Sequence, residues 1–506
     1  MRYSGILLPI SSLPSPYGIG TFSKSARDIA DLLAEAGQHY WQILPLGPTG
    51  YGDSPYQSFS AFAGNPYFID LDTLIGEGLL KKKEVTAVDF GDDERKVDYY
   101  KLYKNRFSVL KLACSRSNFD KTEEYRKFYE DNEFWLPDYA LFMAIKNAQG
   151  GKSSLDWPEA LRKRDDKAIR KAKEDYKDDI RFYCFLQFEF SRQWKALKSY
   201  VNSKGIEIIG DIPIYVSPDS SDFWAHPDMF QVDEDNIPEA VAGCPPDAFS
   251  EDGQLWGNPL YNWEYHEKTG FAWWKNRIGH CLNLYDGVRV DHFRGFDEYY
   301  SIPYGSINAV NGKWMPGPGM KLFNALSENP KVTSKSIIAE DLGFLTPSVI
   351  QLVKDSGFPG MKVIEFAFDS RDTGSGYLPY AYIRNTVVYT GTHDNQTLKG
   401  WYNDELNKDD KKMADDYLGL DGLTIDQKVW QFIRMAMESV SDTCVIPMQD
   451  YLCLDSWARM NHPSTTGGNW CWRLGKDEFT EEVASRIRRL TRLSGRLHQE
   501  EKKSAI

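Results

Sequence analysis

The chain has 506 residues, of which 42% are hydrophobic and 26% charged, a balance typical of a folded protein with one large core or several domains. Its formal net charge of −13 argues against nucleic acid and anionic membrane surfaces as partners. No apolar run suits a signal peptide or a membrane span, and seven scattered cysteines lack a CxxC pair. We therefore expect a cytoplasmic protein with reduced thiols.

Aromatic side chains make up 14% of the residues, including 15 Trp and 29 Tyr. Each ring combines a large apolar face with, in Trp and Tyr, a polar group, and sugar rings stack well on such faces. A large core rich in aromatic residues would explain the same composition. A neutral, sugar-like ligand is thus one of two interpretations at this point.

Short apolar or β-branched runs bounded by Gly, Pro and Asp predict eight strands. Stretches with helical periodicity lie between most of them. This alternation predicts an α/β fold, a (β/α)₈ TIM barrel, with no C-terminal β-sandwich domain. The predicted strands cover residues 4–9, 40–44, 206–211, 286–291, 336–340, 361–366, 386–390 and 443–448, and the clearest helices cover 26–36, 182–201, 271–284, 347–355, 425–440 and 478–497.

Two connections are too long for ordinary barrel loops. Residues 68–180 are rich in Lys and Glu with a helical pattern, which predicts an inserted, mainly helical subdomain. Residues 217–270 are rich in Pro, Gly, Asp and Trp, which predicts an ordered lid with substrate loops. The catalytic barrel would then consist of residues 1–67 and 181–506.

Four acidic residues stand at or just after the carboxyl ends of predicted strands, where barrel enzymes place their catalytic side chains. They are Asp211 in IEIIGD, Asp291 in GVRVD, Glu340 in SIIAE and Asp394 in TGTHD. Each alone could be a helix cap or a salt-bridge partner. Four at one face of a barrel indicate an active site.

Arg289 lies two residues before Asp291, so both side chains point to the same face of an extended strand. Its guanidinium would keep Asp291 ionised, as a nucleophilic carboxylate requires, unless the pair is purely structural. Glu340 would need the opposite tuning, a pKa raised by apolar and anionic surroundings. Two carboxylates in these roles are the arrangement of a retaining glycosidase.

The motifs GDIPIYV, GVRVDHFRG, IIAEDLG and TGTHDNQT, in this order and spacing, resemble the 4-α-glucanotransferases of glycoside hydrolase family 77, also called amylomaltases or disproportionating enzymes. Residues 41–67, 244–261 and 459–473 are similar to the same family, so the resemblance runs from residue 4 to about 475. Single tripeptides such as THD carry no weight, whereas the long stretches are highly specific.

The resemblance implies that Asp291 is the nucleophile of a β-linked glucosyl-enzyme, Glu340 the acid/base and Asp394 a third carboxylate that binds ring hydroxyls. It also implies roles in supporting these groups and in binding the glucan for Arg289, His393, Asp211, Tyr56, Ser54, Asp247, Gln254, Trp256 and Asn461. The alternative for each binding position is a packed loop residue. Ser464 stands where the family commonly has Gly, which leaves the backbone conformation there open.

The implied reaction cleaves an α-1,4-glucan and transfers the glucan segment to the 4-hydroxyl of an acceptor glucan or of glucose. Expected partners are maltooligosaccharides, maltodextrin and starch or glycogen fragments, with no cofactor and no metal. A hydrolytic α-amylase-like glucosidase and a non-catalytic glucan-binding protein are the alternatives. The Trp- and Pro-rich residues 244–263 favour transfer, because an ordered lid can exclude water and orient an acceptor.

A metal-dependent phosphohydrolase is a further alternative, suggested by the adjacent His393 and Asp394. Such sites need several more histidines at helical spacing, and the chain has eight histidines with no HxxxH pattern. This alternative is therefore disfavoured.

Overall fold

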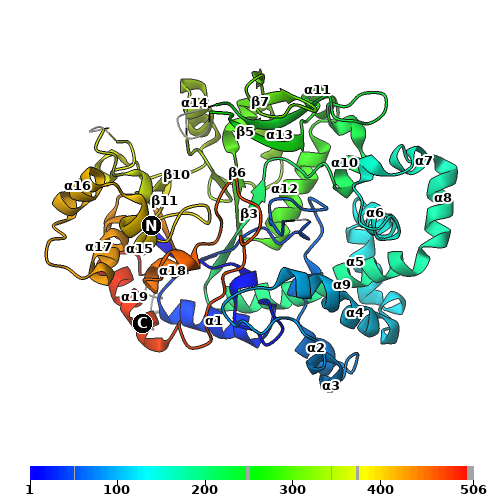
Figure 1. Ribbon diagram of the computed structural model, residues 1–506, viewed down its shortest axis with the longest axis horizontal. Coiled ribbons are helices and arrows are strands. Elements are labelled where there is room, and N and C mark those ends of the chain that lie inside the picture. The colour runs from blue at the N-terminus through cyan, green and yellow to red at the C-terminus, as the bar shows by residue number, and fades with distance from the viewer. Residues whose placement is uncertain (51, 247–250, 344, 372–374, 498–506) are drawn as a thin grey trace, which may run out of the picture.

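The computed structural model describes residues 1–50, 52–246, 251–343, 345–371 and 375–497. Eight parallel strands form its centre (Figure 1), in the order β10-β11-β12-β1-β2-β3-β6-β9. The Ala339 amide donates to the Pro359 carbonyl at 2.9 Å between β9 and the start of β10, so the sheet closes into a barrel. The strands are β1 (Tyr3–Leu7), β2 (Tyr40–Gln42), β3 (Glu207–Pro213), β6 (Gly287–Asp291), β9 (Ile337–Ala339), β10 (Gly360–Val363), β11 (Thr386–Tyr389) and β12 (Thr443–Pro447).

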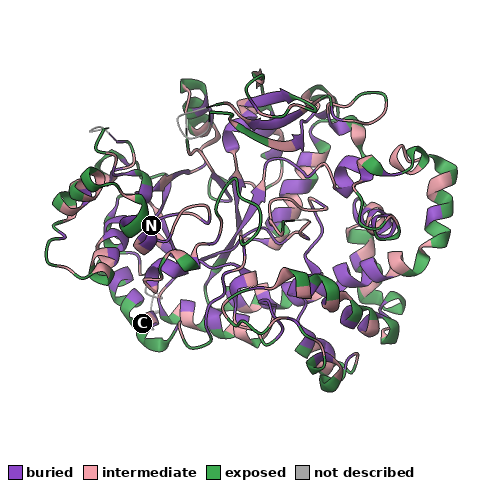
Figure 2. Ribbon diagram, in the orientation of Figure 1, coloured by how far each residue is buried: buried purple, intermediate pink, exposed green. Residues whose placement is uncertain are grey.

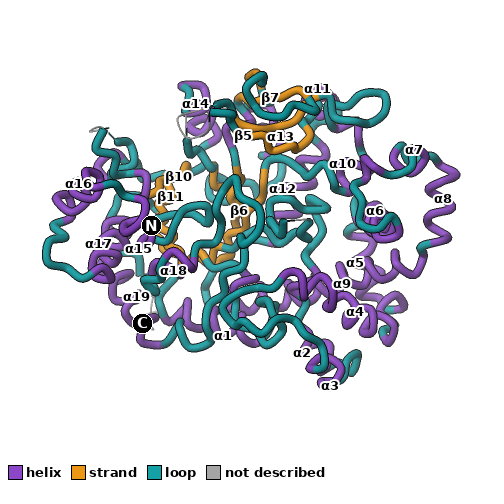
Figure 3. Tube along the Cα trace, in the orientation of Figure 1, coloured by secondary structure: helices purple, strands orange, loops and turns teal. Residues whose placement is uncertain are grey.

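All eight predicted barrel strands are confirmed to within a few residues. Helices between and after the strands surround the sheet (Figure 3), as expected for a (β/α)₈ barrel. They are α1 (Lys24–Glu35), α9 (Lys177–Ser203), α12 (Ala272–Leu284), α13 (Met320–Leu326), α14 (Pro347–Ser356), α15 (Leu398–Gly400), α16 (Lys408–Leu418), α17 (Ile425–Glu438), α18 (Met448–Tyr451) and α19 (Glu481–Leu493).

Local sequence explains where these helices begin. A capping box opens α17, because the Thr424 hydroxyl accepts from the Gln427 amide at 3.4 Å and the Gln427 side chain accepts from the Thr424 amide at 2.9 Å. Apolar residues at helical spacing, including Val429, Phe432 and Ile433, are buried against the barrel.

The long connection after β2 carries a run of helices, which lie together on one side of the barrel in Figure 1. They are α2 (Leu71–Gly76), α3 (Lys82–Thr86), α4 (Tyr99–Arg116), α5 (Glu123–Asp131), α6 (Leu136–Ala148), α7 (Glu159–Arg162) and α8 (Asp166–Asp175). The division of the chain into a barrel, a subdomain at 68–180 and a lid at 217–270 remains a prediction.

Residues 217–270, the predicted lid, contain α10 (Ser221–Ala225), α11 (Trp263–Lys268) and two strands, β4 (Ala240–Cys244) and β5 (Gln254–Pro259), within the described residues. These strands join β7 (Glu298–Pro303) and β8 (Lys313–Pro316) in an antiparallel sheet of order β5-β4-β7-β8, the second group of strands in Figure 3. The sequence predicted no strand here, because the strands are short, contain Gly or Pro, and do not alternate polar with apolar residues.

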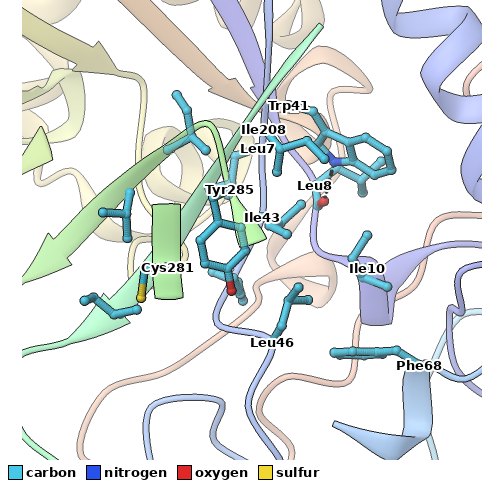
Figure 4. Close-up of a cluster of buried hydrophobic side chains, with 14 of the residues drawn as sticks. Leu7, Leu8, Ile10, Trp41, Ile43, Leu46, Phe68, Ile208, Cys281 and Tyr285 are labelled. Atoms are coloured by element: carbon cyan, nitrogen blue, oxygen red, sulfur yellow. Dashed lines mark hydrogen bonds between the residues drawn. The ribbon is translucent and has the colours of Figure 1, made fainter. Parts of the chain in front are cut away.

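The core lies between the barrel strands and the surrounding helices, where buried residues are concentrated (Figure 2). Figure 4 shows one part of it, with side chains from β1, β2, β3 and α12 packed together. Trp41 is fully buried, and its indole nitrogen donates to the Leu8 carbonyl at 2.8 Å. The polar atom of this large ring is thereby satisfied inside the core.

Among the described residues, no helix combines the length and the apolar character needed to cross a membrane.

Candidate active site

Arg289 links two acidic residues on the neighbouring strands β3 and β6. In the register of β3 and β6, Asp211 lies opposite Arg289. The guanidinium donates to both Asp211 carboxylate oxygens at 3.0 and 2.9 Å, and to Asp291 Oδ1 at 2.8 Å. The ion pair predicted from the spacing of Arg289 and Asp291 is therefore present.

These three residues differ in their exposure to solvent. The side chains of Asp211 and Arg289 are 0% and 4% exposed, whereas that of Asp291 is 33% exposed. Burial opposes the charged form of Arg289, but the charges of Asp211 and Asp291 raise its pKa well above the usual value. Asp291 is thus a solvent-facing carboxylate with a permanent cation fixed against one oxygen.

Asp211 is a buried support of this cluster. Burial raises the pKa of Asp211, while the charge of Arg289 acts in the opposite direction. The Tyr56 hydroxyl donates to Asp211 Oδ2 at 2.9 Å. Asp211 therefore fixes the positions of both the Arg289 guanidinium and the Tyr56 hydroxyl.

Glu340 directly follows β9 and is held by the backbone of two neighbouring segments. The His292 amide donates to Glu340 Oε2 at 2.7 Å, and the Leu342 amide donates to Oε1 at 2.8 Å. Burial and then the charge of Asp291 raise the pKa of Glu340 to about 7. A carboxyl group with this pKa can both give and accept a proton near neutral pH.

Asp394 lies in the loop between β11 and α15 and is held in its charged form. Its Oδ2 lies 3.3 Å from His393 Nε2, and its Oδ1 accepts from the Asn461 side chain at 2.6 Å. Burial favours the neutral acid, but the charge and hydrogen bond of His393, together with Asn461, hold the pKa of Asp394 well below its usual range. Its side chain is 44% exposed, so it faces the site as an anion.

An aromatic wall borders Asp394. The ring of Tyr56 stacks on His393, with centroids 5.0 Å apart and an interplanar angle of 20°. Trp470 lies 5.8 Å from both rings. The predicted site residues Tyr56, His393 and Asn461 are therefore brought together around Asp394.

The segment 217–270 also reaches the site. Trp256 on β5 lies edge-on to His292, with ring centroids 4.7 Å apart, and His292 follows Asp291 directly. The Trp256 indole donates to the Gln254 side chain at 3.0 Å. Ser54 acts within its own turn, because its hydroxyl accepts from the Tyr56 amide at 3.3 Å. Asp247 lies outside the described residues.

His292 belongs to this site, although it is not among the residues predicted from the sequence. Strand alternation would turn it away from Asp291, but β6 ends at Asp291 and His292 takes a left-handed conformation with φ of 54°. Burial lowers the pKa of His292 to about 4, so the ring is neutral near pH 7. The sequence signal that could have placed His292 in the site is its position directly after Asp291 in the motif GVRVDHFRG.

Ser464 lies in the loop that carries Asn461. Its φ is 63°, in the left-handed region that Gly adopts without strain. Replacing Ser464 by Gly should raise the free energy of unfolding by up to about 1 kcal/mol, because relief of the left-handed strain exceeds the entropy that Gly adds to the unfolded chain. Urea unfolding measures this. Ser464→Ala, which keeps the strain, should give no gain, and equal stabilisation by both variants would contradict the account.

Within the described residues, no group of three or more His, Cys, Asp or Glu side chains is arranged to hold a metal ion.

A (β/α)₈ barrel whose carboxyl face carries one carboxylate bound to an arginine, Asp291, and a second carboxyl group with a raised pKa, Glu340, fits a barrel enzyme of the glycosidase class. Comparison with known sequences makes the assignment specific. The sequence model of the 4-alpha-glucanotransferases, glycoside hydrolase family 77, matches residues 8–477. The chain belongs to this family.

Relatives cover almost the whole chain. It is 50% identical to the 4-alpha-glucanotransferase of Clostridium butyricum over 96% of this chain and 99% of that protein. It is 46% identical to the enzyme of the same name from Thermus thermophilus over 98% and 99% of the two chains. A solved structure of amylomaltase from Streptococcus agalactiae in complex with acarbose superposes with a TM-score of 0.94 at 41% identity, covering 98% of this chain and 100% of that one.

Proposed function

We propose that this chain transfers segments of α-1,4-glucan between maltooligosaccharides, and that Asp291, Glu340 and Asp394 carry the reaction. The observation that carries the proposal is the contrast between two neighbouring carboxylates. Asp291 is paired with Arg289 at 2.8 Å, whereas the pKa of Glu340 is raised to about 7. One group is suited to attack and the other to proton transfer.

In the first half-reaction, an Asp291 oxygen attacks the anomeric carbon of the donor glucan, and the bond from that carbon to the glycosidic oxygen breaks. Glu340 gives its proton to the departing oxygen, and the shortened glucan leaves with a free 4-hydroxyl. In the second, the Glu340 carboxylate takes the proton of an acceptor 4-hydroxyl, whose oxygen attacks the same carbon and releases Asp291. Two inversions retain the α configuration.

The remaining residues would bind and orient the sugar. Asp394, held as an anion by His393 and Asn461, is placed to accept hydrogen bonds from ring hydroxyls as the ring flattens toward the oxocarbenium-like state. Tyr56, stacked on His393, and Trp256, edge-on to His292, offer aromatic surface near the carboxylates. Starch or glycogen fragments and maltodextrin are the proposed natural donors.

Transfer rather than hydrolysis requires that an acceptor sugar exclude water from the glucosyl-enzyme. The lid residues Gln254 and Trp256, bonded to each other beside His292, support this role. Incubation with maltotriose should therefore give glucose and a series of longer maltodextrins. Chromatography of samples taken over time measures these products. Glucose and maltose without longer chains would instead indicate a hydrolase.

A further inference from the structure

A buried carboxylate outside the carbohydrate site holds both ends of the loop that carries Asp394. Asp450 lies in α18, directly after β12, and is 1% exposed. It accepts from the Thr390 hydroxyl at 2.6 Å and from the Leu398 amide at 2.8 Å. Thr390 is the first residue after β11, and Leu398 is the first residue of α15. The two hydrogen bonds therefore bracket His393 and Asp394.

A second buried carboxyl group supports the same loop from the other neighbouring strand. Glu365 follows β10, is 7% exposed, and its amide donates to the Thr390 carbonyl at 3.1 Å. Its Oε1 has no hydrogen-bond partner among the described residues. A Cβ added at Gly391 would lie 2.8 Å from this oxygen, so the loop backbone passes directly over the carboxyl group. The base of the loop is thus enclosed by β10 and β12.

The charge of Asp450 acts on Glu365. Burial raises the pKa of Asp450 to about 7, and burial followed by the charges of Asp450 and Glu405 raises the pKa of Glu365 well above its usual range. Holding such groups in a core is costly unless their hydrogen bonds are needed. Because the two hydrogen bonds to Asp450 come from the two ends of one loop, the position of that loop is what the buried carboxyl group maintains.

We propose that Asp450 is a positioning residue for transfer, whose carboxylate fixes both ends of the loop from Thr390 to Leu398 and so places Asp394 against the reacting sugar ring. At 1% exposure, Asp450 lies out of reach of a bound sugar and acts through the loop. The inference rests on the proposed role of Asp394. A displaced Asp394 would weaken binding of the flattened ring more than binding of the substrate, so kcat should fall while KM changes little.

Three variants test this with maltotriose as donor and acceptor. Asp450→Ala removes both bonds and should lower kcat by about 10- to 100-fold with KM within about twofold, as a misplaced active-site group does. Thr390→Val removes only the hydroxyl and should give a smaller loss of kcat. Asp450→Asn keeps an acceptor for Leu398 and an amide that can donate to the Thr390 oxygen, so it should restore kcat to within about threefold of the wild type.

The matched control is Asp70→Ala. Asp70 is also a buried carboxylate, 4% exposed, and caps α2 through the Thr73 amide at 2.9 Å, on the side of the helical insertion. The Asp70→Ala substitution should lower the melting temperature and leave kcat per folded molecule unchanged. If Asp450→Ala behaves like this control, or if Asp450→Asn is no better than Asp450→Ala, the proposal is wrong.

Asp394→Asn separates this inference from the proposed function. Retained transfer in that variant would refute the role of Asp394 itself. Loss of transfer in Asp394→Asn together with full kcat in Asp450→Ala would refute only the positioning role of Asp450.

Discussion

Asp291→Asn should lower the rate of transfer from maltotriose by about 10⁴-fold or more while leaving the affinity for maltooligosaccharides within about threefold. The amide has nearly the shape of the carboxylate but cannot form the bond to the anomeric carbon. Asp211 still neutralises Arg289 through two hydrogen bonds, so the fold should persist. Initial rates by glucose release and binding by calorimetry measure the two quantities.

Asp28→Asn is the control for this variant, because Asp28 pairs with Lys24 on the outer helix α1. Its transfer rate should equal that of the wild type. An Asp291→Asn protein that still transfers at an unaltered rate would refute the nucleophile assignment, and one that neither binds glucan nor keeps its melting temperature would point to a structural role instead.

Glu340→Gln should lower turnover of maltotriose by about 10²- to 10⁴-fold, because the leaving oxygen no longer receives a proton. An α-maltosyl fluoride donor needs no such proton, so the first half-reaction should persist with this donor. The second half-reaction still lacks a base for the acceptor hydroxyl. The variant should therefore accumulate the maltosyl-enzyme, seen as a burst of fluoride release followed by slow turnover.

The pH dependence of the wild type follows from the same group. As the proposed acid, Glu340 has to be protonated when the donor is cleaved, and its pKa is raised to about 7, so kcat/KM for maltotriose should fall as the pH rises through that value. The fluoride donor in the first half-reaction should show no such alkaline limb. The same limb in Glu340→Gln with maltotriose would assign it to another residue.

The barrel could be predicted from the sequence because its strands are buried apolar runs with clear boundaries, such as the run ending at Asp291. The pairing of Arg289 with Asp291 followed from strand alternation alone. The antiparallel sheet formed by β4, β5, β7 and β8 was missed, because its stability comes from pairing between distant short segments rather than from a local pattern.

Two other features depend on contacts that no local pattern reports. His292 turns toward the site only because the backbone leaves the strand conformation after Asp291. Asp450 and Glu365 meet the loop of Asp394 from neighbouring strands, so neither could be assigned before the strand order was known. The carboxylates proposed to carry the reaction could be predicted from the sequence, because barrel strands deliver them to one face.

The covalent role of Asp291 is tested most directly by trapping the intermediate. Glu340→Gln is incubated with α-maltosyl fluoride, quenched in acid and digested, and the peptides are sequenced by mass spectrometry. The account predicts a maltosyl ester on Asp291. A label at any other residue of the variant protein would contradict this role of Asp291. So would unlabelled protein that converts the fluoride into a product of inverted anomeric configuration.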